Sequence, residues 1–241
     1  MVKIDPYKLA SGCEGDSVKE IRLIDIREEI LSDNQNLADE IRKKLRQNGV
    51  FMLNLMSSPG SGKTSLIVET IRRLKDEFRI GVIEGDIDSL VDSEKIAREG
   101  IPAVQLRTGG ACHLDAPMIE SALAAMDLGA FDFLIIENVG NLVCPAEFDT
   151  GAARKAMILS VPEGDDKVLK YPLMFSVCDA LVINKIDYLG LSDFNLDLLK
   201  ERVQMLNRKI SIFTVSCRTG EGIDEWCDWL RREIAAYKNR C

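Results

Sequence analysis

Several absences narrow what this 241-residue chain can be. It has one histidine, His113, and seven cysteines, none of which belongs to a Cys-x-x-Cys pair. No apolar run approaches the length that crosses a bilayer, and the N-terminus lacks the apolar core of a signal peptide. These features predict a cytoplasmic protein without a membrane partner, in which cysteines act as thiols or metal ligands rather than as disulfides.

Positive charge is also sparse. The net charge is −8 and the sequence contains no basic block, which argues against a nucleic-acid partner. Hydrophobic residues make up 46% of the chain, and its length suits one large domain with a full core.

Short apolar runs alternate with amphipathic segments along the chain. The runs expected to form strands are residues 50–56, 79–84, 103–106, 131–137, 157–161, 180–184 and 211–215. The segments expected to form helices are residues 62–78, 92–99, 115–128, 195–207 and 223–237. This alternation predicts an α/β fold, with a doubly wound, mostly parallel sheet covered by helices on both faces.

The N-terminal part is expected to lie outside this sheet. Residues 1–20 are polar and mixed, which predicts a loose tail, whereas residues 21–48 show mostly helical spacing and predict a helical extension. Asp33 and Asn34 could break or cap it, so one kinked helix and two helices are both compatible with the pattern. Residues 21–241, with this extension included, are expected to form a single domain, since the sequence shows no repeat and no second domain.

A phosphate-binding loop lies between the first predicted strand and the next helix. Residues 57–64 read Ser-Ser-Pro-Gly-Ser-Gly-Lys-Thr, which matches the P-loop pattern except that Ser57 replaces its first glycine. Backbone N–H groups of such a loop cradle phosphates, Lys63 reaches the β/γ-phosphates and the Thr64 hydroxyl ligates Mg²⁺. The predicted nucleotide-binding residues here are Ser58, Pro59, Gly60, Ser61, Gly62, Lys63, Thr64 and Ser65.

Acidic residues follow two of the predicted strands. Asp86 and Asp88 follow one, and Glu137 ends another, at the sheet edge where α/β proteins bind ligands. A carboxylate after an apolar strand is typical of a Walker B motif. We therefore predict that Asp86 and Glu137 act with Thr64 at Mg²⁺, and that Asp88 could orient water. The predicted catalytic residues are Lys63, Asp86, Asp88 and Glu137.

The tetrapeptide Asn184-Lys185-Ile186-Asp187 follows a predicted strand and matches the guanine-specificity motif. The Asp187 carboxylate can accept from guanine N1–H and the exocyclic amine, a paired contact that adenine does not offer. Ser216 and Cys217 follow the last strand, where a loop over the base is expected. We therefore predict that the chain binds GTP and GDP, and that the base is bound by Asn184, Lys185, Asp187, Ser216 and Cys217.

A second group of residues has metal-binding chemistry. Cys112-His113 precedes a predicted helix, and Cys144 lies shortly after Glu137. Thiolate and imidazole suit Ni²⁺ or Zn²⁺, but three ligands leave a tetrahedral site incomplete, so water, substrate or a second subunit would complete it. An ordinary loop pair and a packed cysteine remain the alternative.

These motifs occur in one order that resembles the nickel-incorporation GTPases of nickel–iron hydrogenase maturation, the HypB family. The resemblance rests on residues 57–64, 84–86, 111–116, 136–145 and 184–187, and runs from about residue 20 to the C-terminus. Urease nickel-chaperone GTPases are the nearest relatives to exclude. They typically carry Glu-Ser-Gly-Gly and Cys-Pro-His motifs, where this chain has Glu-Asn-Val-Gly at residues 137–140 and a separate Cys112-His113 and Cys144.

The resemblance implies a SIMIBI-class P-loop GTPase with a slow, Mg²⁺-dependent activity that dimerises when GTP is bound. It implies a Ni²⁺ or Zn²⁺ site at the dimer interface, made by residues that match Cys112, His113 and Cys144. It also implies a small zinc- and nickel-binding partner and delivery to the hydrogenase large subunit precursor. Some members carry an N-terminal cysteine motif or a His-rich tract, whereas this chain has only Cys13 near its start.

Three other functions remain open at this point. A P-loop small-molecule kinase would use Lys63 with a base such as Asp88, although such kinases usually take ATP. A signalling GTPase would carry the Cys/His cluster incidentally, and a urease-type nickel chaperone would deliver its metal elsewhere.

Overall fold

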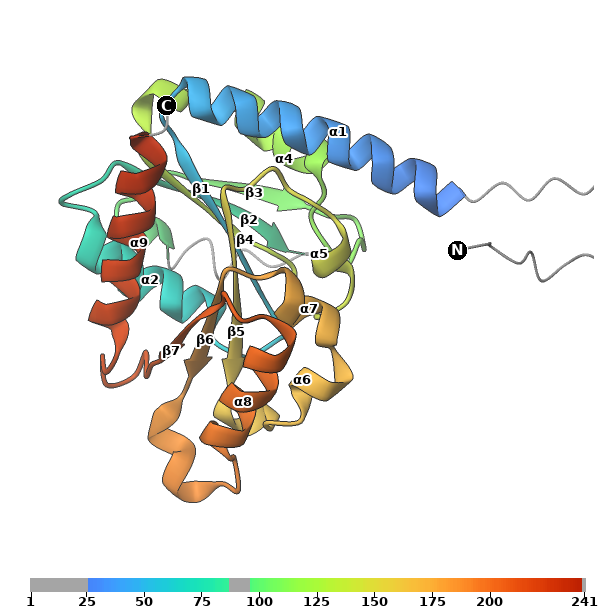
Figure 1. The fold of residues 1–241 in the computed structure, drawn as a ribbon. Coiled ribbons are helices and arrows are strands. Elements are labelled where there is room, and N and C mark those ends of the chain that lie inside the picture. Colours follow the sequence, from blue (N-terminus) through green and yellow to red (C-terminus); the bar gives the residue numbers. More distant parts are fainter. Residues whose placement is uncertain (1–25, 87–95, 240–241) are drawn as a thin grey trace, which may run out of the picture.

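Seven parallel strands form the centre of the molecule (Figure 1). The structure is a computed structural model, and it describes residues 26–86 and 96–239. In these residues the strand order is β3-β2-β4-β1-β5-β6-β7, and every pairing is parallel. The strands are β1 (Phe51–Ser57), β2 (Ile80–Asp86), β3 (Ala103–Arg107), β4 (Phe133–Glu137), β5 (Arg154–Ser160), β6 (Ala180–Asn184) and β7 (Ser211–Thr214).

The central strands are buried on both faces. Every residue of β1, β4 and β6 is buried, which explains why their sequences are nearly continuous apolar runs. Alternate residues of β1 face opposite layers: Phe51, Leu53 and Leu55 belong to one core cluster, and Met52 belongs to another.

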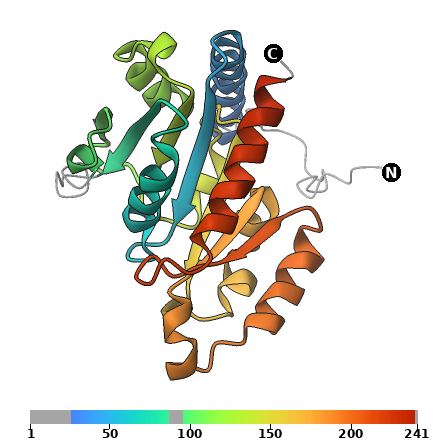
Figure 2. The same cartoon turned by 90° about the vertical axis from the view of Figure 1, so that its left-hand side faces the viewer.

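Helices cover both faces. On the first lie α2 (Lys63–Leu74) and α9 (Ile223–Lys238), which contribute Ile71 and Trp226 to the core and lie across the near face of the sheet in Figure 2. On the second lie α1 (Ile26–Gln47), α4 (Ala116–Ala124), α7 (Pro172–Val177) and α8 (Leu196–Leu206). Shorter elements are η1 (Leu128–Ala130), α5 (Cys144–Glu147), η2 (Val161–Glu163), α6 (Lys167–Lys170) and η3 (Ile186–Leu191).

The predicted doubly wound α/β fold is confirmed, and the described sheet is entirely rather than mostly parallel. The described part of the N-terminal extension is one helix, α1, which packs against α4 (Figure 1). This helix continues through Asn34. Asn34 does not break it because its side chain is used in hydrogen bonds to other segments. The predicted tail over residues 1–20, with Cys13, lies outside the described residues, as do residues 92–95 of one predicted helix.

Within the described parts of the chain, every helix is too short or too polar to cross a lipid bilayer.

Candidate nucleotide and metal sites

The phosphate loop joins the end of β1 to the start of α2. Gly60 and Gly62 both have positive φ angles, 75° and 100°, which favour glycine at these positions. Gly62 has a second requirement, because a Cβ there would lie 2.5 Å from Asn184 Nδ2. Helix α2 begins at Lys63, so its first N–H groups point at this loop, as a phosphate site requires.

Ser57, the residue that replaces the first glycine of the motif, has a role in this loop. It is buried, its Oγ donates to the Ser58 carbonyl at 2.7 Å, and the same oxygen accepts a hydrogen bond from Lys63 Nζ at 2.9 Å. Among the described residues other than glycine, only Lys185 has a positive φ. The φ of Ser57 is therefore not positive, and its backbone conformation does not require a glycine. The serine that replaces the first glycine of the motif therefore holds the Lys63 side chain by a hydrogen bond.

Glu163 contacts the phosphate loop and was missed by the sequence analysis. Its carboxylate accepts from the Ser58 hydroxyl and, within a capping box, from the Ser160 backbone N–H at 2.7 Å and hydroxyl at 2.8 Å. The Ser-x-x-Glu pattern at residues 160–163 is a recognisable helix-start signal. Its contact with Ser58, 105 residues away, is not encoded in that pattern.

The carboxylates of the predicted Mg²⁺ site lie at the carboxyl edge of the sheet. Glu137 is buried at the end of β4, level with Glu84 of β2, and its Oε1 accepts from the Thr64 hydroxyl at 2.7 Å. Hydroxyl and carboxylate oxygens are the hard ligands that Mg²⁺ prefers, so this pair fits the ion. Asp86 is the last residue of β2, and the structure describes its backbone but not its side chain. Asp88 lies outside the described residues.

The predicted guanine motif is hydrogen-bonded directly to the phosphate loop. Asn184 Nδ2 donates to the Ser61 carbonyl at 2.9 Å, and Lys185 Nζ donates to the Gly60 carbonyl at 2.7 Å. Asn184 Oδ1 accepts from the backbone N–H groups of Lys185, at 2.8 Å, and Cys217, at 3.3 Å. Asn184 therefore ties the two nucleotide-binding loops and the β7–α9 loop into one unit.

Asp187 lines a cavity of ≈ 350 Å³ beside these loops. Its Oδ1 accepts from the Ser216 hydroxyl at 2.7 Å, and the exposed Arg218 lies 3.7 Å from its Oδ2. The cavity is lined by Gly62, Ser65, Pro162, Asn184, Lys185, Asp187, Tyr188, Cys217 and Arg218. Most of the predicted base-binding residues thus share one cavity, with Pro162, Tyr188 and Arg218 added by the tertiary structure.

The three predicted metal ligands come together in space. Candidate ligand atoms of Cys112, His113 and Cys144 all lie within 4.8 Å of one another, and the two sulfurs are 3.0 Å apart. Cys112 is exposed, and the other two are partly buried. Two thiols and one imidazole in this arrangement fit a borderline or soft divalent cation such as Zn²⁺ or Ni²⁺.

Packing around the cluster orients the histidine and changes the pKa values. The Phe148 ring stacks on His113, with 3.9 Å between ring centroids and 26° between planes. Burial lowers the pKa of His113, which favours the neutral imidazole that binds metals, against the opposing charges of Asp115 and Glu147. The hydrogen bond with Cys112, helped by burial, raises the pKa of Cys144.

Two asparagines connect the segment after Glu137 to the metal cluster. Asn138 is fully buried, and its Oδ1 accepts from the backbone N–H of Leu114 at 3.0 Å. Asn141 Nδ2 donates to the Cys112 carbonyl at 3.2 Å. Between them lies Gly140, where a Cβ would sit 3.0–3.1 Å from Pro59 of the phosphate loop. The segment after β4 thus contacts the phosphate loop on one side and the metal cluster on the other.

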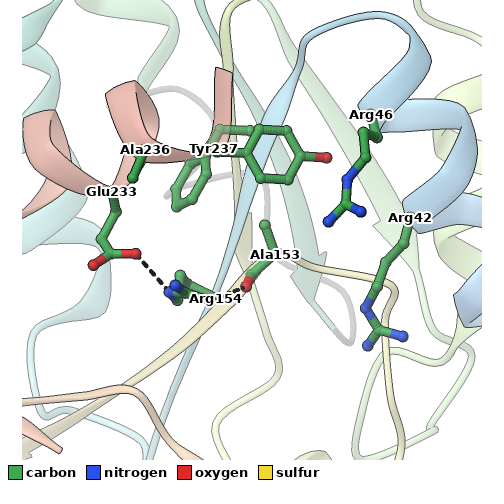
Figure 3. Close-up of a pocket in the computed structure, with 8 residues that line it drawn as sticks. Arg42, Arg46, Ala153, Arg154, Glu233, Ala236 and Tyr237 are labelled. Carbon is green, nitrogen blue, oxygen red and sulfur yellow. Dashed lines mark hydrogen bonds and ion pairs between the residues drawn. The ribbon is translucent and has the colours of Figure 1, made fainter. Parts of the chain in front are cut away.

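A different cavity, of ≈ 100 Å³, lies at the opposite end of the sheet, between α1, β5 and α9 (Figure 3). Arg154 is paired there with Glu233 at 2.7 Å, and Arg42 with Asp149 and Asp39. The Arg46 guanidinium lies 5.7 Å from the centroid of the Tyr237 ring. Arg42 and Arg154 are neutralised by carboxylates within the protein, which disfavours an anionic ligand in this cavity.

Comparison with known proteins gives a consistent result. Residues 51–214 match the family model described as "CobW/HypB/UreG, nucleotide-binding domain". The chain is 46% identical over 228 residues to the hydrogenase maturation factor HypB of Rhizobium leguminosarum bv. viciae, covering 95% of this chain and 76% of that protein. It is 44% identical over 216 residues to the hydrogenase/urease maturation factor HypB of Helicobacter hepaticus, covering 88% of each. The solved structure of Helicobacter pylori HypB in complex with nickel matches with a TM-score of 0.80 and 41% identity, over 85% of this chain and 96% of that one.

Proposed function

This chain belongs to the HypB family of the CobW/HypB/UreG nucleotide-binding proteins, and on that premise we propose that it is a GTP-dependent metallochaperone. It hydrolyses GTP to drive nickel insertion into the large subunit of nickel–iron hydrogenase. The observation that carries this proposal is that Asn138 and Asn141, which closely follow Glu137 in the chain, each hydrogen-bond to the segment that holds Cys112 and His113.

The nucleotide roles follow from positions at the sheet edge. Residues 58–65 bind the phosphates, and Lys63 stabilises the negative charge that develops on them during transfer. Thr64, Asp86 and Glu137 hold Mg²⁺, which neutralises phosphate charge when bound, and Asp88 orients water. Asn184, Lys185, Asp187, Ser216 and Cys217 bind the guanine base of GTP and GDP. The slow rate and the Mg²⁺ dependence belong to this proposal.

The metal is cargo held by Cys112, His113 and Cys144. Three ligands on a partly exposed surface leave room for a second copy of the chain, which supports a GTP-dependent homodimer with the metal between its subunits. Ni²⁺ is the physiological cargo, and Zn²⁺ competes for the same ligands. A small zinc- and nickel-binding maturation protein and the hydrogenase large subunit precursor complete the pathway in the cytoplasm.

The test is to measure Ni²⁺ and Zn²⁺ affinity and stoichiometry without nucleotide, with GDP and with a non-hydrolysable GTP analogue. Nucleotide-dependent values are expected, because the hydrogen bonds from Asn138 and Asn141 make the two sites interdependent. Equal affinities and stoichiometries in all three states would refute the proposal. The Cys112→Ser/Cys144→Ser double variant is the control that must lose the metal.

Urease is a second candidate target, because the Helicobacter hepaticus relative is named a hydrogenase/urease maturation factor. Restoring hydrogenase or urease activity in cells that lack their own factor distinguishes the two targets. Two simple measurements test the two other candidate functions. A preference for ATP would indicate a small-molecule kinase, and full biological activity of the double cysteine variant would indicate a signalling GTPase.

A further inference from the structure

Asn34 of α1 bonds to both of the segments that carry the metal ligands. It lies mid-helix with only 6% of its surface exposed. Asparagine favours caps and turns over helix interiors, and a buried amide needs partners for both its donor and its acceptor. In this helix the partners come from two other segments of the chain.

The first bond reaches the Cys112–His113 segment. Asn34 Oδ1 accepts from the backbone N–H of Ala116 at 2.8 Å, and Ala116 is the first residue of α4. The first N–H groups of a helix have no partner within the helix, so Asn34 supplies one. Leu114 and Ala116 are both fully buried in the core cluster to which α1 contributes. The start of α4, and the ligands just before it, are thereby fixed relative to α1.

The second bond reaches the Cys144 segment. Asn34 Nδ2 donates to the Asp149 carbonyl at 2.9 Å, and Asp149 directly follows Phe148, whose ring stacks on His113. Arg42 of α1 also pairs with the Asp149 carboxylate, and its Nε donates to the Ala152 carbonyl at 3.3 Å. This segment is therefore held against α1 by three hydrogen bonds.

Close packing holds the same region. At Gly151 a Cβ would lie 2.7 Å from Ile41 Cγ2 and 2.9 Å from the Ala38 carbonyl oxygen. The backbone after Asp149 therefore passes directly over α1, with no room for a side chain between them.

We propose that Asn34 is a positioning residue that sets the geometry between the Cys112–His113 segment and the Cys144 segment, and so tunes metal affinity from α1. The inference rests on the proposed metal-binding function. Its physical basis is that one amide donates to one segment and accepts from the other, so that a single rigid group fixes their separation.

Groups that hydrogen-bond a metal ligand directly typically change affinity 10–100-fold when they are removed. Asn34 acts one step further out, through the backbone of Ala116 and Asp149, so we expect an effect at the lower end of that range. Because α1 lies outside residues 51–214, this control does not use the nucleotide-binding residues.

The experiment uses the full chain with Asn34→Ala and Asn34→Asp. Asn34→Ala removes both bonds, whereas Asn34→Asp keeps the acceptor for Ala116 and loses the donor to Asp149. Ni²⁺ and Zn²⁺ affinities are titrated, the thiolate-to-Ni²⁺ absorption bands are recorded, and GTP affinity is measured on the same samples. The matched control is Asn207→Ala, which removes another amide whose Nδ2 bonds carbonyls, including that of Cys178 at 2.8 Å, but bonds neither of the two metal-ligand segments.

We expect Asn34→Ala to lower metal affinity about tenfold, to shift the absorption bands and to leave GTP affinity within about twofold. We expect Asn34→Asp to lie between Asn34→Ala and wild type, and Asn207→Ala to match wild type in metal affinity. Unchanged affinity and bands in both Asn34 variants would overturn the inference. The inference would also be overturned if Asn34→Ala lowered GTP affinity as much as metal affinity, because that would indicate general unfolding. It would be overturned as well if Asn207→Ala lowered metal affinity as much as Asn34→Ala. If instead the wild-type chain binds metal no better than Cys112→Ser/Cys144→Ser, it is the proposed function that fails.

Discussion

Asn138 accepts a hydrogen bond from the backbone N–H of Leu114, with 3.0 Å between Oδ1 and N, and so joins the end of β4 to the residue after His113. The same oxygen accepts from Val139 N–H at 2.9 Å, and Nδ2 donates to Asn54 Oδ1 at 3.1 Å. A displacement of the segment after Glu137 is therefore transmitted to the metal-ligand segment through one buried side chain.

Asn138→Ala should weaken the dependence of metal affinity on nucleotide. The substitution leaves the Leu114 N–H without its partner, at a cost of about 1–3 kcal/mol, and removes one of two hydrogen bonds between the segments, the other being from Asn141 to the Cys112 carbonyl. Metal titrations with GDP and with a GTP analogue measure the effect. Asn54→Ala is the matched control, since it removes a buried partner of Asn138 but leaves the Leu114 contact. Undiminished nucleotide dependence in Asn138→Ala would show that the coupling does not run through this side chain.

Gly140→Ala should weaken GTP binding. The new Cβ would sit 3.0–3.1 Å from Pro59, so the phosphate loop must shift by a few tenths of an ångström. We expect a loss of about tenfold in GTP affinity or hydrolysis, because small displacements of phosphate-positioning groups are costly. Gly190→Ala is the control, since a Cβ at that position would have no other atom within 4 Å. Equal GTP affinities of the two variants would contradict this interpretation.

Asp187→Asn should reduce GTP affinity and improve binding of xanthosine triphosphate. An amide replaces one carboxylate acceptor with a donor, which suits the carbonyl that xanthine carries where guanine has its amine. Losing a charge-assisted bond costs about 1.5–3 kcal/mol, which is roughly 10–100-fold in affinity. Competition binding with GTP, ATP and xanthosine triphosphate measures the shift. Arg218→Ala, which removes the exposed partner 3.7 Å from Asp187, should change base preference little.

Asp149→Asn should destabilise the protein at neutral pH, and the difference should vanish in acid. Burial alone would raise the pKa of Asp149, but the hydrogen bond from Arg42 and the charge of Lys155 outweigh it, so the pKa is lowered. A lowered pKa in the folded state means stabilisation that is present above the unfolded pKa, about 3.9, and is lost as pH falls through the folded value. We expect a loss of about 1–3 kcal/mol at pH 7.

Denaturant unfolding at pH 7 and at stepwise lower pH measures this difference. Asp39→Asn removes a more exposed partner of the same Arg42 and should cost only about 0–1 kcal/mol. A wild-type advantage over Asp149→Asn that persists unchanged into strong acid would contradict the assignment.

Features encoded by contiguous residues could be read from the sequence. The central strands β1, β4 and β6 are apolar runs buried on both faces, and the phosphate loop and the guanine motif are short peptides with recognisable sequence patterns. Parallel strands bring their carboxyl ends to one edge, so the sequence alone places residues 57–64, Glu137 and residues 184–187 together. The pairing of Thr64 with Glu137 agrees with that expectation.

Other parts of the site depend on residues that meet only when the chain folds. Glu163 bonds Ser58 across 105 positions, and Asn34 bonds Asp149 across 115. No local pattern marks such partners, because a buried amide or carboxylate bonds whatever hydrogen-bond partner the packing brings within about 3 Å. The sequence by itself thus determined the fold class, and it predicted the nucleotide and the three metal-binding side chains. The tertiary structure alone decided which side chains hold them in position, since that depends on how α1 and the segments after β4 and β5 pack.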